Sequence, residues 1–213
     1  MNAISSHEKE LYAHLYAKIT RGTNKIMNLG QLLDYAATHF PEKTALIYQD
    51  RSMTFKELFF RASLFAQKLK ASGIKPRDRV LLFFENSIEF YIGYYAIVQL
   101  GAVVAPLNVY LKERELVHII SDAQPMLLIA SSTLLKKLEE DHIDAQVPVL
   151  TEVDMDLLSP YDAAVCQPVP ALLDEHEMAA LLYTSGTTGL PKGVMLSSKN
   201  IFTNCIQAIS RLG

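Results

Sequence analysis

The sequence has 213 residues, of which 50% are hydrophobic and 20% charged, and its formal net charge is −3. This composition excludes an intrinsically disordered chain, provides no basic surface for nucleic acid, and suffices for one sizeable hydrophobic core. Two cysteines far apart in sequence, Cys166 and Cys205, indicate free thiols in a reducing compartment rather than a disulfide.

The first segment, residues 1–27, predicts a helical extension. Ser5 and Glu8 have the spacing of a capping box, and apolar residues then follow at helical intervals before Gly22. We expect this helix to pack on the domain surface, with membrane or partner binding as the alternative. The charged N-terminus does not resemble a secretory signal.

The second region, residues 28–75, predicts a helix, a hairpin and another helix. The first helix begins at Asn28 and ends before Pro41. Residues 44–49 and 52–55 flank a polar turn and favour a β-hairpin. A second capping box, Thr54 with Glu57, opens the next helix, which should end near Gly73.

The third region, residues 76–213, alternates apolar strands with helices. Strands are expected at 80–84, 102–107, 126–130, 148–151, 179–183 and 194–196, and helices at 88–100, 112–121, 133–140 and from about 198. The proline-containing stretch 152–177 should be irregular. Continuous apolar strands separated by helices predict an α/β fold: a doubly wound, largely parallel sheet with helices on both faces.

One uncharged stretch, residues 90–111, is long enough to raise the question of a membrane span. Gly101 and Pro106 interrupt it, which favours a buried helix that leads into a buried strand. We therefore expect no transmembrane segment and a cytoplasmic protein, with peripheral association at a membrane left open.

The most informative segment is residues 183–193, YTSGTTGLPKG. Its glycines let backbone N–H groups approach an anion, its hydroxyl residues donate hydrogen bonds, and Lys192 adds a positive charge. This combination predicts a polyphosphate-binding loop. The spacing excludes a Walker A loop, because Lys192 precedes Gly193 and Val194 rather than a hydroxyl residue, and it excludes a dinucleotide fingerprint.

This loop resembles the signature phosphate loop of the adenylate-forming superfamily, which contains acyl-CoA synthetases, peptide-synthetase adenylation domains and beetle luciferases. Residues 53–58 (MTFKEL) and 100–108 (LGAVVAPLN) are similar to two earlier family motifs and stand in the same order. Asn108 and the run 113–116 (EREL) favour a fatty-acyl or aryl-CoA ligase over a peptide-synthetase domain.

The resemblance implies a ligase that uses ATP with Mg²⁺ to activate a carboxylate, a fatty acid in our interpretation, as an acyl-adenylate, and then transfers it to coenzyme A. It assigns phosphate binding to a set within the loop: Thr184, Ser185, Gly186, Thr187, Thr188, Gly189 and Lys192. No nucleophile or base is evident, so we expect no catalytic residue within this chain. The family often has a histidine at the position that Ser198 occupies here. Any role of that family histidine is therefore in doubt for this chain.

The resemblance also implies that this chain is an N-terminal fragment, because the later family motifs, including those for adenine, magnesium and most of the acyl pocket, are not found in it. We expect the isolated fragment to be inactive and its bare strand edges to favour a homodimer. The alternative is a short non-catalytic protein that binds nucleotide or acts as an interaction module.

The histidines share no ligand-like spacing with one another or with the cysteines. We expect surface or packing roles and no protein metal site, because Mg²⁺ would arrive with ATP on its phosphate oxygens. These histidines are His7, His14, His39, His118, His142 and His176.

Overall fold

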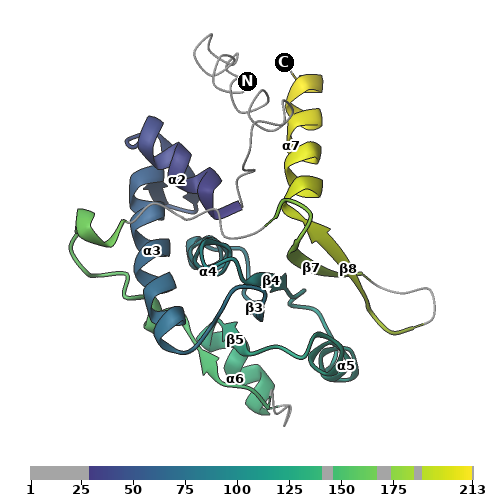
Figure 1. Cartoon of the computed structure of the whole chain (residues 1–213). Coiled ribbons are helices and arrows are strands. Elements are labelled where there is room, and N and C mark those ends of the chain that lie inside the picture. The colour runs from purple at the N-terminus through teal and green to yellow at the C-terminus, as the bar shows by residue number, and fades with distance from the viewer. Residues whose placement is uncertain (1–28, 141–145, 167–173, 185–188, 213) are drawn as a thin grey trace.

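The computed structural model describes residues 29–140, 146–166, 174–184 and 189–212 (Figure 1). The helix expected within residues 1–27 lies outside these ranges and stays a prediction. The strands are β1 (Thr44–Tyr48), β2 (Arg51–Thr54), β3 (Arg79–Phe83), β4 (Val103–Pro106), β5 (Leu127–Ala130), β6 (Val149–Leu150), β7 (Met178–Thr184) and β8 (Lys192–Ser197). The helices are α2 (Leu29–His39), α3 (Phe55–Ala71), α4 (Ile88–Gln99), α5 (Glu113–Ala123), α6 (Ser132–Glu140) and α7 (Ser198–Leu212), with short 3₁₀ helices η1 (Glu152–Met155) and η2 (Ala163–Val165).

The main sheet has six strands in the order β6-β5-β3-β4-β7-β8. Neighbours from β6 to β7 are parallel, whereas β7 and β8 are antiparallel. The predicted α/β class with a largely parallel sheet is therefore confirmed. The last pair runs antiparallel because a short loop joins β7 to β8, and a parallel crossover needs a dozen or more residues.

The two faces of the sheet are covered by different helices, because side chains alternate along each strand. On β3, Val80 and Leu82 belong to the core that includes residues of α2, α3 and α4. Leu81 and Phe83 belong to a second core that includes residues of α5 and α6. This arrangement is visible in Figure 1, and it confirms the predicted helices on both faces.

Helix α3 has the two end signals that its sequence predicts. The Glu57 N–H donates to Oγ1 of Thr54 at 3.2 Å, and the Thr54 N–H donates to a Glu57 carboxylate oxygen at 2.8 Å. At the other end Gly73 has a φ of 92°, and the Ile74 N–H reaches the Leu69 carbonyl at 3.1 Å. These hydrogen bonds satisfy backbone groups that a helix end leaves open.

The uncharged stretch folds as expected. Helix α4 buries Ile92, Ala96 and Ile97 completely and ends before Gly101, whose φ is 70°. The chain then enters β4, whose first three residues are buried. Within the described ranges no helix combines the length and apolar character that a bilayer crossing requires.

The irregular connection after β6 packs against α3. Met155 is fully buried in the core next to α3 and α4. The Arg61 guanidinium donates to the Ser159 carbonyl at 2.7 Å, and Lys68 forms an ion pair with Asp154 at 2.8 Å. The described part of this connection therefore lies on the opposite side of the molecule from the β7–β8 hairpin (Figure 1).

Candidate phosphate-binding site

The segment 183–193 lies at the turn of the β7–β8 hairpin. The register pairs Tyr183 with Gly193 and Thr184 with Lys192. Two of the predicted phosphate-binding residues, Thr184 and Lys192, thus face each other on the last pair of the hairpin. Ser185, Gly186, Thr187 and Thr188 lie outside the described residues, so their predicted roles remain predictions.

The glycines at the C-terminal side of this segment serve different purposes. Gly189 has a φ of 90°, a conformation that L-amino acids with side chains rarely adopt. Gly193 instead sits close to its neighbours: a Cβ atom there would lie 3.0 Å from Leu181 Cδ1 and 3.3 Å from the Tyr183 ring. Gly189 thus has a backbone conformation that favours glycine, and Gly193 makes room for the aromatic ring.

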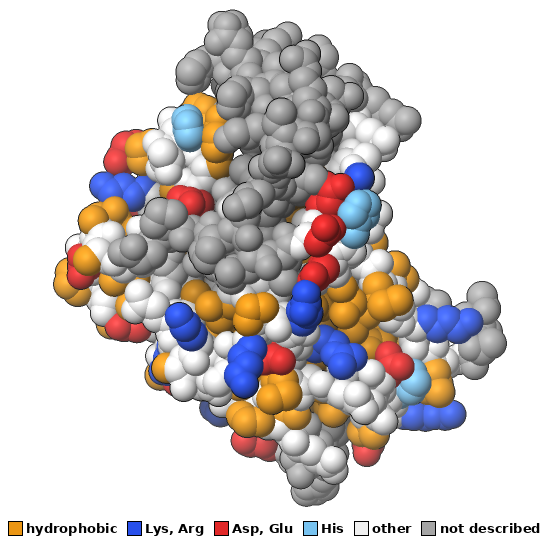
Figure 2. All heavy atoms as spheres, in the orientation of Figure 1, with side chains coloured by type: hydrophobic (Ala, Val, Ile, Leu, Met, Phe, Trp, Pro, Cys, Tyr) orange, Lys and Arg blue, Asp and Glu red, His pale blue; other side chains and the backbone are white. Residues whose placement is uncertain are grey.

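Lys192 suits an anionic ligand. Its side chain is exposed, and it forms no salt bridge with any residue that the structure describes. Figure 2 shows basic and histidine side chains on the side of the molecule where α5 and the hairpin lie. An ammonium that has no ion pair with the described residues, beside a hydroxyl residue and a positive-φ glycine, has the chemistry that an anion-binding site requires.

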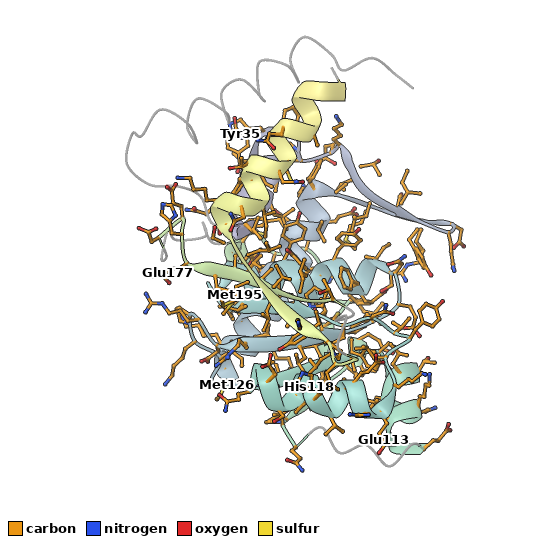
Figure 3. All side chains as sticks on the ribbon, turned by 90° about the vertical axis from the view of Figure 1, so that its right-hand side faces the viewer. Tyr35, Glu113, His118, Met126, Glu177 and Met195 are labelled. Carbon is orange, nitrogen blue, oxygen red and sulfur yellow. The ribbon has the colours of Figure 1, made fainter. Side chains whose placement is uncertain are left out.

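Helix α5 contacts the hairpin on β7 and at the residue that precedes β8. The Tyr183 hydroxyl donates to a carboxylate oxygen of Asp122 at 2.6 Å. His118 Nε2 lies 3.0 Å from the Pro191 carbonyl oxygen, and Figure 3 shows His118 on the helix beside the hairpin. Because a carbonyl oxygen only accepts hydrogen bonds, Nε2 must carry the proton.

The Tyr183 phenol is held in its protonated form. Burial raises its pKa most, and the hydrogen bond to Asp122 and the negative charge of that carboxylate raise the pKa further. The hydroxyl therefore remains a donor throughout the neutral pH range.

The roles of His118 and Asp122 as supports of the hairpin are not evident from the sequence. His118 was expected to have a surface or packing role, and Asp122 was not singled out. The only available signal was their spacing, since residues four apart share one face of a helix. Their partners are 73 and 61 residues away in sequence, so no local pattern could have identified them.

Ser198, where the related family often has histidine, begins α7 and is buried. The preceding Ser197 makes reciprocal contacts with Asn200: Oδ1 of Asn200 accepts from the Ser197 N–H at 3.0 Å, and the Asn200 N–H donates to Ser197 Oγ at 3.2 Å. These contacts fix the start of α7 directly after β8. Ser198 has no ligand role that the structure indicates.

Within the described ranges no three His, Cys, Asp or Glu residues are grouped as a metal site would require. Both cysteines are free thiols; Cys166 is half-buried and Cys205 is exposed.

The sequence of this chain matches a family model and several known proteins. The family model described as AMP-binding enzyme matches residues 33–212. Bacitracin synthase 3 of Bacillus licheniformis is 29% identical over 214 residues, which cover 100% of this chain and 3% of that protein. The 4-hydroxybutyrate–CoA ligase 2 of Metallosphaera sedula is 28% identical over 194 residues, covering 83% of this chain and 35% of that enzyme.

A solved structure has the same fold. The o-succinylbenzoate CoA synthetase from Bacillus subtilis, in complex with the acyl-adenylate intermediate OSB-AMP, has a TM-score of 0.73 and 28% identity. The match covers 88% of this chain and 47% of that one. This chain thus spans less than half the length of each of these relatives. Because the family model matches most of its residues, the chain belongs to the AMP-binding enzyme family, the adenylate-forming enzymes that its phosphate loop resembles.

Proposed function

We propose that this chain is the polyphosphate-binding part of an adenylate-forming acid–thiol ligase. The whole enzyme would activate a carboxylate with ATP and Mg²⁺ and transfer the acyl group to coenzyme A. The observation that supports this most directly is the hairpin end within the matched family region. There Thr184 faces Lys192, which has no ion pair with any residue that the structure describes. The Bacillus subtilis synthetase has also been solved in complex with ATP and magnesium ion, at a TM-score of 0.71 and 27% identity.

The proposed roles follow from the negative charge that builds up on pyrophosphate as it leaves. A carboxylate oxygen attacks the α-phosphorus of ATP, and pyrophosphate leaves with additional negative charge. Lys192 neutralises part of that charge, and the hydroxyl and glycine N–H groups orient the β- and γ-phosphates. In this proposal the nucleotide-binding residues are Thr184, Ser185, Gly186, Thr187, Thr188, Gly189 and Lys192.

We propose the substrate only as a chemical class, a carboxylate, and not as a particular compound. The fatty acid expected from the sequence stays a prediction, because the names of the relatives point to varied products: a bacitracin synthase, a 4-hydroxybutyrate–CoA ligase and an o-succinylbenzoate CoA synthetase. Mg²⁺ would bind phosphate oxygens, so the proposal requires no metal site on the hairpin.

The test is a titration of the 213-residue chain with MgATP, followed by ³¹P NMR. We expect weak binding, with a Kd on the order of 1 mM, that shifts the β- and γ-phosphate resonances. Lys192→Met should abolish these shifts, whereas Lys70→Met, which removes an exposed lysine of α3, should leave them unchanged. Absence of binding, or equal effects of the two variants, would overturn the proposal.

A second measurement concerns catalysis. We expect these 213 residues alone to release no pyrophosphate above background from ATP with any carboxylate. Carboxylate-dependent release would contradict this expectation and would show that the chain contains a complete adenylation site.

A further inference from the structure

The end of the β7–β8 hairpin extends beyond the support of the main sheet. In the described part of the chain, the register of β4 with β7 consists of the pair Val104 with Ala180. Residues 181–184 of β7 pair with the edge strand β8; Leu181 is still buried in the core that includes α5 and α6, whereas Leu182 and Thr184 are exposed. A two-stranded hairpin alone is only marginally stable in water, so its end needs another support to hold a fixed position.

Helix α5 provides that support at two points. Asp122 accepts the hydrogen bond of the Tyr183 hydroxyl on β7, and His118 donates to the Pro191 carbonyl just before β8. The two side chains are four residues apart and so lie on the same face of the helix. Two separate contacts resist rotation of the hairpin end as well as its displacement.

Each contact is one residue away from a predicted phosphate-binding residue. Tyr183 precedes Thr184, and Pro191 precedes Lys192. The same helix thus fixes the backbone on both sides of the loop, next to the side chain that would meet the polyphosphate. A displacement of about 1 Å in such a group can reduce activity about a hundredfold.

The helix is itself firmly anchored. Leu116, Ile119 and Ala123 are buried in the core shared with α6 and the sheet. Its C-terminal end closes at Gln124, whose φ is 46°, with a hydrogen bond of 3.0 Å to the Ile120 carbonyl. The hairpin end is therefore tied to the rigid core of the domain through α5.

We propose that His118 and Asp122 are positioning residues that hold Lys192 and Thr184 in place for the polyphosphate of the nucleotide. This inference rests on the proposed function, because it assumes that the hairpin end binds phosphate. It assigns α5 a role in nucleotide binding although none of its residues belongs to the loop.

The experiment compares variants that keep each hydrogen bond with variants that remove it. His118→Gln retains an N–H donor and Asp122→Asn retains an acceptor oxygen, whereas His118→Leu, Asp122→Ala and Tyr183→Phe lose the bond. Ser121→Ala, at an exposed position of α5, is the matched control. MgATP affinity is measured by ³¹P NMR, and amide hydrogen exchange of residues 178–197 by mass spectrometry.

We expect each bond-removing variant to weaken MgATP binding about tenfold and to accelerate exchange in the hairpin, because one ordinary hydrogen bond corresponds to about that factor. The bond-retaining variants and the control should bind MgATP within about twofold of the unchanged chain, on the same scale. The double variant of Tyr183→Phe with Asp122→Ala should be no weaker than either single variant, since both remove the same contact.

The outcomes separate the two proposals. If the unchanged chain binds MgATP and the bond-removing variants bind equally well, the positioning role is wrong while the proposed function stands. If the bond-retaining variants lose as much affinity as the others, the effect comes from general packing and the positioning role is again wrong. If the unchanged chain does not bind MgATP, the proposed function fails, and the positioning role fails with it even if hydrogen exchange responds.

Discussion

Gly193 lies directly across from Tyr183 in the β7–β8 hairpin, and a methyl group at position 193 would be 3.3 Å from the tyrosine ring and 3.0 Å from Leu181 Cδ1. The ring cannot easily move aside, because its hydroxyl is bound to Asp122. Leu181 is buried and has little freedom either.

Gly193→Ala should therefore lower the free energy of unfolding by about 1 kcal/mol, since additional methyl groups in packed sites are usually destabilising. The measurement is urea denaturation of the chain and its variant. In an Asp122→Ala background, where the ring is released, the same substitution should cost less. An equal cost in both backgrounds would show that the tie to Asp122 does not restrict the ring.

Gly73 terminates α3 with a φ of 92°, and its N–H donates to the Lys70 carbonyl at 3.0 Å. No atom lies within 4 Å of a Cβ built there, so the constraint is conformational rather than steric. Gly73→Ala should lower the free energy of unfolding by about 1 kcal/mol, because a left-handed backbone is unfavourable for alanine. Gly73→Asn should cost less, as asparagine tolerates this conformation better, and thermal denaturation of both variants would decide the order.

Gln99, the last residue of α4, is buried, and among the described residues its Nε2 has no hydrogen-bond partner. Its Oε1 accepts from the Ser63 hydroxyl at 3.3 Å. Gln99→Met should leave the free energy of unfolding unchanged or raise it by up to about 1 kcal/mol, because it removes an unsatisfied donor. The Ser63 hydroxyl can then bond to its own helix.

Gln99→Glu is the contrasting variant at this position. It buries a negative charge with a single hydroxyl donor and should destabilise the fold by about 2 kcal/mol or more. Urea denaturation at neutral pH measures both variants. A strong loss of stability in Gln99→Met would mean that the amide has a role in the core that its visible contacts do not explain.

The ion pair of Lys68 with Asp154 predicts a pH dependence. The hydrogen bond from Lys68 lowers the pKa of Asp154 most, and the hydrogen bond from the Thr151 N–H, at 2.9 Å, lowers that pKa as well. Since the folded-state pKa lies below that of the unfolded chain, this contribution to stability is present above the unfolded pKa. It is lost as the pH falls through the folded pKa.

Lys68→Met should therefore destabilise the chain slightly at pH 7, by an amount that solvent screening keeps small. The difference from the unchanged chain should shrink as the pH falls below the ordinary aspartate pKa, and it should vanish once the pH is below the lowered folded-state pKa, where the carboxyl is protonated in both. Urea denaturation at several pH values, with Lys70→Met as the exposed control, checks this. A difference that persists at acidic pH would assign the loss to packing instead.

Much of the fold was predictable because its signals are local. The capping box of Thr54 and Glu57, the glycine stop at Gly73 and the apolar strand of residues 80–84 each depend on a few neighbouring residues. The strand order is different in kind. It depends on which strands pair across long stretches of sequence, and here β3 lies between β4 and β5 while β7 pairs with β4.

The sequence by itself determined the family, because the motif that carries the resemblance is one continuous run, residues 183–193. Only the tertiary structure decided what holds that loop. Because β8 runs antiparallel to β7, the hairpin end lies next to α5. His118 there contacts Pro191, and Asp122 contacts Tyr183. Contacts between residues more than 60 positions apart arise from packing of the whole domain, and no local pattern records them.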